Sequence, residues 1–126
     1  MKENLQSLHD EIAGILEKEI GAAGYDFACG KFEGLGWIDF HYKCSTHDGP
    51  FPRIALKIQK NAVHLYLMLW LEGQPPPLQR YVGLFGKSAI GAGCLRVKWL
   101  DDNRREAIAE IARLALRESG RQKSGR

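Results

Sequence analysis

The sequence predicts a single α+β domain, a two-layer sandwich in which a mainly antiparallel sheet carries the N-terminal and C-terminal helices on one face. Three observations lead to this prediction. The chain has 126 residues, which is the size of one domain. Both ends show apolar residues spaced three and four apart, as in amphipathic helices. Between them, apolar and polar residues alternate in short segments, as in strands with one buried face.

The two predicted helices are amphipathic. The first covers residues 3–20 and is followed by glycines, which commonly stand just beyond the end of a helix. The last covers residues 104–118. Asp101, Asp102 and Asn103 are its candidate N-caps, and Asn103 with Glu106 has the spacing of a capping box. The stripe of this second helix that we expect to be buried consists of Ile108, Ile111, Ala112 and Ala115.

Four segments between the helices alternate between apolar and polar residues. They are residues 37–44, 53–59, 62–70 and 94–100. The first three are consecutive and joined by short turns, which predicts an antiparallel meander. Residues 73–77 contain three prolines and interrupt the pattern, because proline has no backbone N–H to donate to a neighbouring strand. A short helix is expected over residues 78–85.

The net charge of +3 is concentrated at the C-terminus. Residues 117–126 carry four basic side chains against Glu118, so residues 1–116 sum to zero. We therefore expect one folded domain over residues 1–118 and a disordered basic tail over residues 119–126. A domain that binds nucleic acid usually has a basic face, so this distribution argues against nucleic acid as the partner.

The cysteines and the apolar runs indicate a cytoplasmic protein. Cys29, Cys44 and Cys94 are odd in number and lack paired spacing, so no disulfide framework is expected. No apolar run reaches the ~20 residues of a membrane span, and the N-terminus lacks the apolar core of a signal peptide. Cys94 would be reactive if basic neighbours such as Lys87 or Arg96 lowered its pKa, and inert if it were buried.

Several short motifs follow one another in the second half of the chain. They are Tyr81, the step Phe85-Gly86-Lys87, the segment Gly91-Ala92-Gly93-Cys94 and the opening Leu100-Asp101-Asp102 of the last helix. Together they resemble the C-terminal signature of YdhG-like domains of unknown function, and the resemblance covers roughly residues 34–118. Members of that family are described as having a frataxin-like sandwich. The resemblance therefore implies the same layered fold and implies no catalytic residue.

The strongest functional feature is the face of the predicted sheet that the helices leave uncovered. Strand alternation places basic and aromatic side chains there, and such a surface suits an anionic or aromatic ligand through charge and stacking. Such a surface also suits a homodimer contact. Its simplest interpretation is the solvent-exposed face of a sheet that is covered on its other face only. The candidate ligand-binding residues are Trp37, His41, Lys43, Arg53, Lys57, His64, Tyr66, Arg96 and Lys98.

An acidic stripe on the first helix supports a second hypothesis. Glu3, Asp10 and Glu17 recur every seven residues, and carboxylate oxygens are the ligands that hard cations prefer. Frataxin-like proteins bind iron on an acidic helix, so the resemblance implies an iron-binding or iron-chaperone protein. Seven-residue spacing puts these carboxylates ~10 Å apart along the helix axis, too far for one ion to bridge without further ligands. The other interpretation is an ordinary solvated helix face.

No catalytic arrangement is recognisable from residue spacing. A nucleophile with its base, or an acid with a base, would be needed for an enzyme, and whether the fold assembles one near His41 or His64 is left open. The sequence therefore predicts a non-enzymatic module that binds a small anionic ligand or a protein partner through its sheet face. An iron-handling protein is the alternative.

Overall fold

The computed structural model describes residues 2–29, 32–45, 47–91 and 93–122. Helix α1 (Lys2–Ile20) is followed by strands β1 (Tyr25–Cys29), β2 (Phe32–Cys44), β3 (His47–Gln59) and β4 (Ala62–Leu67). Three short helices follow, which are η1 (Pro77–Tyr81), α2 (Val82–Phe85) and η2 (Lys87–Ala89). Strand β5 (Cys94–Val97) and helix α3 (Asp102–Gln122) complete the described chain.

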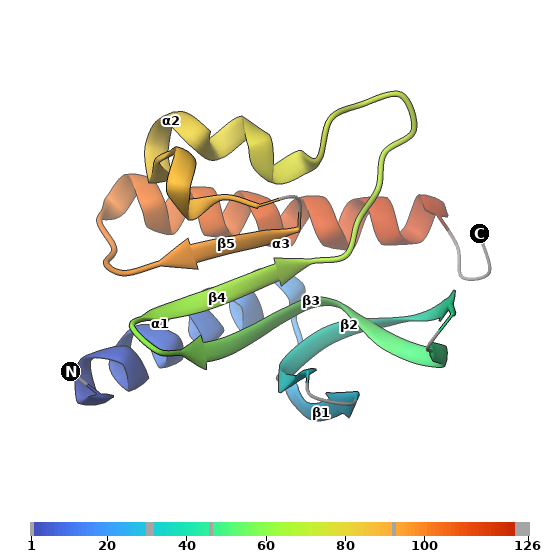
Figure 1. Ribbon diagram of the computed structural model, residues 1–126, viewed down its shortest axis with the longest axis horizontal. Helices are drawn as coiled ribbons and strands as arrows, with labels where there is room; N and C mark the ends of the chain where they lie inside the picture. Colours follow the sequence, from blue (N-terminus) through green and yellow to red (C-terminus); the bar gives the residue numbers. More distant parts are fainter. Residues whose placement is uncertain (1, 30–31, 46, 92, 123–126) are drawn as a thin grey trace.

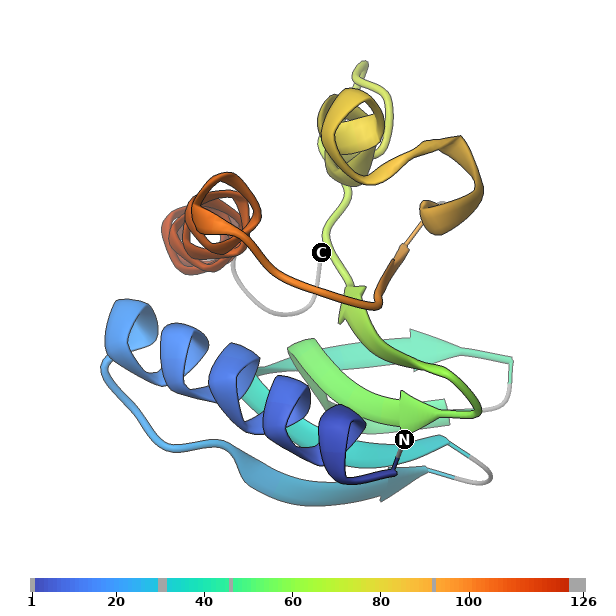
Figure 2. The ribbon, with the colours of Figure 1, turned by 90° about the vertical axis from the view of Figure 1, so that its left-hand side faces the viewer.

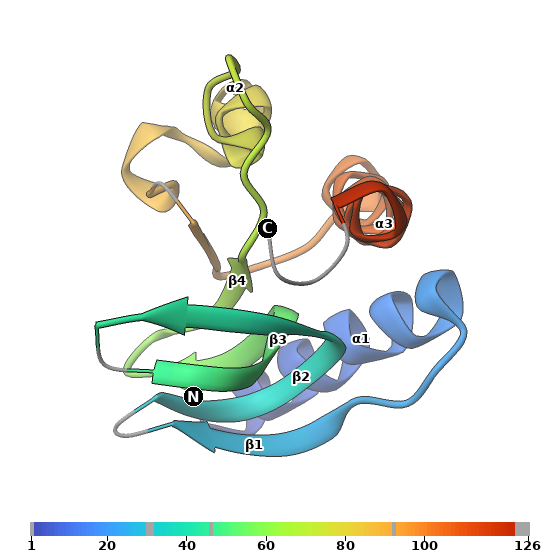
Figure 3. The ribbon, with the colours of Figure 1, turned by 90° about the vertical axis from the view of Figure 1, so that its right-hand side faces the viewer.

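The strands form one antiparallel sheet in the order β1-β2-β3-β4-β5 (Figure 1). Helices α1 and α3 contact each other, and both contact β3. Figures 2 and 3 show the two helices on the same side of the strands. The predicted α+β sandwich, with the terminal helices on one face of the sheet, is therefore confirmed.

The hydrophobic core lies between the sheet and the two long helices. From α1 it contains Ile12 and Leu16, and alternate residues of β4 and β5 face them. The predicted stripe of the last helix is buried as expected, because Ile108, Ile111, Ala112 and Ala115 have no exposed surface. No helix in the described part of the chain is long and apolar enough to span a membrane.

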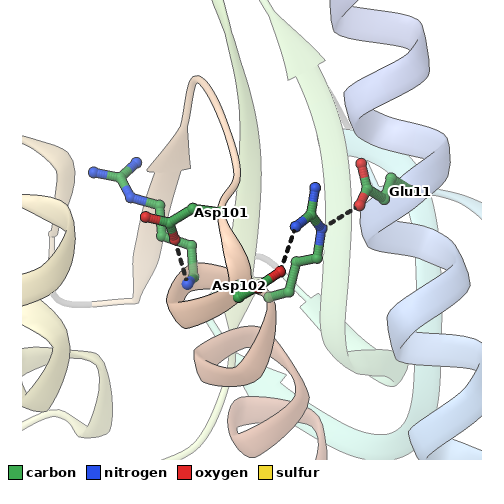
Figure 4. A network of polar contacts seen from close by, with 5 residues as sticks. Glu11, Asp101 and Asp102 are labelled. Atoms are coloured by element: carbon green, nitrogen blue, oxygen red, sulfur yellow. Dashed lines mark hydrogen bonds and ion pairs between the residues drawn. The ribbon is translucent and has the colours of Figure 1, made fainter.

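The last helix begins and ends outside its predicted limits. The carboxylate of Asp101 accepts a hydrogen bond of 2.8 Å from the backbone N–H of Arg104 (Figure 4). Of the three candidate N-caps, Asp101 is therefore the one that caps the helix, and Asn103 lies inside it. Helix α3 also continues to Gln122, four residues past the predicted domain boundary. Of the predicted tail, residues 123–126 lie outside the described residues.

Ion pairs on the outer side connect the two long helices. Arg105 of α3 donates to Glu11 of α1 and to its own neighbour Asp102 (Figure 4). Arg113, two turns further along α3, reaches Glu19 at 3.0 Å. Since these side chains are partly exposed, each pair contributes little to stability.

Strands β2 and β3 form a long hairpin that bends. Ile38 has a φ of 61°, a left-handed conformation that is rare for a β-branched residue. Figure 3 shows β2 turning back at its middle. The outer half of β3 contains Pro50 and Pro52, and β4 pairs with β3 only from Ile54 onward.

The bend coincides with an error in the predicted faces of residues 37–44. Trp37 was expected on the uncovered face, but it is 1% exposed and belongs to the core. The register explains this result, since Trp37 is paired with Ile54, and paired residues of neighbouring strands share a face. The indole N–H of Trp37 donates to the carbonyl of Ala22 at 3.0 Å, which satisfies its one polar atom.

Candidate functional site

The uncovered face of the sheet carries a basic row made of Lys57, His64 and Arg96. These residues are direct cross-strand partners on β3, β4 and β5. Their chain neighbours Val63, Leu65, Leu95 and Val97 are fully buried beneath the helices. Because successive side chains of a strand point to opposite faces, the basic row points away from the helices.

His64 is the centre of a small polar cluster. Its Nδ1 lies 3.4 Å from the hydroxyl of Tyr66 and 3.5 Å from the sulfur of Cys94. Gln59 donates a 2.8 Å hydrogen bond to the same hydroxyl. Burial lowers the pKa of His64, and the positive charges of Arg96 and Lys57 lower it further. The imidazole is therefore neutral at pH 7 and has one nitrogen available as an acceptor.

Cys94 lies within reach of a base, but its own environment keeps it protonated. A thiol beside an imidazole is the arrangement of a nucleophile with its general base. Burial, however, raises the pKa of the Cys94 thiol, and the charge of Arg96 opposes this only in part. The cluster is therefore better suited to hydrogen bonding than to nucleophilic attack at neutral pH. The side chains of Cys29 and Cys44 lie outside the described part of the structure.

Arg53 was also expected on the uncovered face, but it is 3% exposed. Its guanidinium lies 3.8 Å from the centre of the Phe40 ring and donates to the carbonyl of Met68 at 2.9 Å. Stacking on an aromatic ring and bonding to a backbone carbonyl make the burial of this cation tolerable. Arg53 therefore helps to hold the bent hairpin against the segment after β4, and it does not belong to the free surface.

Two further predicted residues lie away from the basic row. His41 and Lys43 are at the tip of the β2–β3 hairpin, where His41 Nε2 is 2.8 Å from a carboxylate oxygen of Asp48. Lys43 of β2 is paired with Asp48 of β3, and Asp48 lies nine residues before Lys57 on β3. Strand alternation predicts which face of the sheet a side chain occupies, but it does not predict how far along that face the side chain lies. His41 and Lys43 were therefore predicted to belong to the same surface as Lys57, although the fold separates them.

Lys98 stands beside Arg96 at the edge of a pocket of about 290 Å³. Of its eight lining residues, sequence reasoning proposed only Arg96 and Lys98, and Trp99 and Arg104 are among those it missed. Alternation along residues 94–100 predicts Trp99 on the same face as Leu95 and Val97, but 53% of its surface is exposed because β5 ends two residues earlier. The full lining consists of Asn61, Phe85, Ser88, Ala89, Arg96, Lys98, Trp99 and Arg104.

The acidic residues of α1 are spread along the helix. Asp10 accepts a 2.9 Å hydrogen bond from Gln6 and lies 3.2 Å from His9 Nδ1, and these hydrogen bonds, His9 first, lower the pKa of Asp10. Glu17 is exposed, and the side chain of Glu3 lies outside the described residues. Among the side chains that the structure describes, no three His, Cys, Asp or Glu residues are grouped closely enough to hold a metal ion.

The fold and the basic row define this protein by its geometry, as a helix-covered antiparallel sheet with a cationic patch on its other face. Comparison of the chain with family models, with curated proteins and with solved structures found no match. The resemblance of residues 34–118 to YdhG-like domains therefore stays a prediction.

Proposed function

We propose that this protein is a binding module that captures a small anionic ligand on the uncovered face of its sheet, at the basic row. The observation that carries this proposal is the register, which aligns Lys57, His64 and Arg96 across three neighbouring strands. The rows on either side on the same face are Ala55–Tyr66–Cys94 and Gln59–Ala62. Neither of these two rows contains an acidic residue.

The electrostatics of His64 support an anionic ligand. Both neighbouring cations oppose protonation of its ring, so the potential at the centre of the row is positive. An anion placed over His64 would interact favourably with Lys57 and Arg96 at once. Tyr66, which stands beside the row with its hydroxyl held by Gln59, offers an aromatic surface to a ligand that also carries a ring.

The size of the row favours a small ligand over a protein partner. Three neighbouring strands span about 10 Å, at a strand spacing of about 4.8 Å. A stable protein–protein interface buries about 800 Å² on each partner, much more than this row provides. A small anion that touches two or three of these side chains matches its dimensions.

Calorimetric titration with phenyl phosphate at low ionic strength tests this proposal. Phenyl phosphate combines an anionic group with one ring. We expect the variant Lys57→Gln to weaken binding about three- to tenfold, because one charge-assisted contact is lost. The matched control is Lys43→Gln, which removes the same charge at the hairpin tip and should bind like the wild type.

Two results would contradict the proposal. The first is equal binding by the wild type and by a protein in which both Lys57 and His64 are replaced by glutamine. The second is equal weakening by Lys57→Gln and Lys43→Gln, which would indicate attraction to net charge rather than to the basic row.

A further inference from the structure

The pocket beside the basic row is built from segments that are distant in the sequence. Asn61 comes from the β3–β4 turn, Phe85 from α2 and Ser88 from η2, while Trp99 and Arg104 come from the connection to α3 and its first turn. We infer that this pocket is an oxyanion site, which holds the phosphate or carboxylate group of a ligand between Arg96, Lys98 and Arg104. This inference rests on the proposed function, because it adds an anchoring point for the same anionic ligand.

Arg104 carries the inference, because it is a buried cation whose hydrogen bonding is incomplete. Only 9% of its surface is exposed. Its Nη1 donates to the carbonyl of Trp99 at 3.4 Å, and its Nη2 donates to the carbonyl of Leu84 at 3.2 Å. Its Nε is buried and has no hydrogen-bond partner among the residues that the structure describes. A guanidinium has five N–H donors, so these contacts leave an acceptor missing.

The charge of Arg104 is also without a carboxylate partner in the described part of the chain. The nearby carboxylate of Asp101 accepts from the backbone N–H of Arg104 instead. The rings of Trp99 and Phe85 lie 3.6 Å and 4.7 Å from the guanidinium carbon and offset part of its desolvation. A buried guanidinium without a counterion is costly, so an anion in the pocket would supply both the charge and the acceptor.

The rest of the lining agrees with an anionic occupant. None of the residues that line the pocket is acidic, and no salt bridge between described residues involves Arg96, Lys98 or Arg104. Arg96 is held at the rim by a 2.6 Å hydrogen bond from its Nη2 to the carbonyl of Ser88. The side chains of Asn61 and Ser88 add neutral donors, as in sites that bind phosphate or carboxylate oxygens.

The size of the pocket limits the ligand. A volume of about 290 Å³ is at the lower end of the range for small-molecule sites. An oxyanion with a short or planar substituent fits such a volume. Because Arg96 belongs to both the pocket and the basic row, a ligand with two anionic groups, or with one anionic group and a ring, could contact both at once.

Titration with inorganic phosphate at constant ionic strength tests the inference. Binding is followed by calorimetry and by the NMR resonance of the Trp99 indole N–H, which the variant Trp99→Phe assigns. We expect saturable binding that shifts this resonance, and we expect Lys98→Gln to weaken it about tenfold. Lys43→Gln is the control with the same change in charge. Arg104→Lys keeps the charge but loses the planar set of donors, and it should also weaken binding.

Arg104 holds two backbone carbonyls, so its replacement can disturb folding, whereas Lys98 is exposed and its replacement does not. The inference is overturned if phosphate fails to shift the Trp99 resonance at tens of millimolar, or if Lys98→Gln binds phosphate like the wild type. If Lys57→Gln weakens phenyl phosphate binding and Lys98→Gln does not, the basic row stands and the pocket fails. The reverse pattern supports the pocket and rejects the row.

Discussion

At the scale of single residues, His64 couples the charge of the candidate site to the stability of the fold. Its pKa in the folded protein lies below the value of 6.5 that it has in an unfolded chain. As the pH falls, the unfolded chain therefore takes up this proton before the folded protein does. The unfolding free energy rises with pH wherever the unfolded state binds more protons. The contribution of His64 is thus complete above pH 6.5 and is lost as the pH falls below this value.

Urea unfolding across this pH window checks the coupling. We expect the wild type to lose more stability than His64→Gln between about pH 7.5 and about pH 5, because glutamine does not titrate there. In the wild type, the NMR titration of the His64 ring should have its midpoint below 6.5. Parallel stability curves for the two proteins would show that the folded and unfolded chains bind this proton equally.

At the scale of secondary structure, Gly34 sets how closely β2 approaches β3. A Cβ atom at this position would lie 2.3 Å from the carbonyl oxygen of Leu56. That oxygen belongs to the backbone of a paired strand, since Leu56 is the partner of Leu35. It cannot move away without disturbing the pairing on which the hairpin depends. The glycine is therefore required by close approach of the strands.

The variant Gly34→Ala should lower the unfolding free energy by about 1–3 kcal/mol, the usual cost of overpacking a dense site. Gly83→Ala is the control, because a Cβ at Gly83 meets no atom within 4 Å. Gly83 lies in α2, where alanine is the better helix former, so that variant should be at least as stable as the wild type. A urea midpoint for Gly34→Ala equal to that of the wild type would contradict the close approach.

At the scale of the whole molecule, the hydrophobic interface between the sheet and helices α1 and α3 holds the two layers together. Ile111 is fully buried in this interface. Leu116 lies five residues later on α3 and is 44% exposed. The two residues therefore give a matched comparison of core and surface on one helix. Ile12 and Leu16 of α1 belong to the same core cluster as Ile111.

Ile111→Ala should cost about 2–5 kcal/mol, because it removes buried methylene groups and leaves a cavity between layers. Leu116→Ala should change stability by at most about 0.5 kcal/mol, as surface replacements usually do. Thermal or urea unfolding of both variants measures the difference. Similar losses for the two variants would mean that α3 does not bury this stripe against the sheet.

Local patterns in the sequence were sufficient to predict the two layers and much of the basic row. The spacing of apolar residues in residues 3–20 and 104–118, and the alternation around His64 and Arg96, depend only on the geometry of a single helix or strand. Wherever the strands are regular, as in β4 and β5, the predicted faces are correct. Lys57, His64 and Arg96 then become neighbours through ordinary antiparallel pairing.

Only the tertiary structure decided which charged side chains are free and which share a site. Pairing with Ile54 placed Trp37 in the core, and contacts with Phe40 and the carbonyl of Met68 buried Arg53. The length of the hairpin separated Lys43 from the basic row. The packing of α2, η2 and the first turn of α3 brought Arg104 beside Arg96. Periodicity describes one element at a time, whereas a pocket depends on distances between elements, and these are determined by packing of the whole chain.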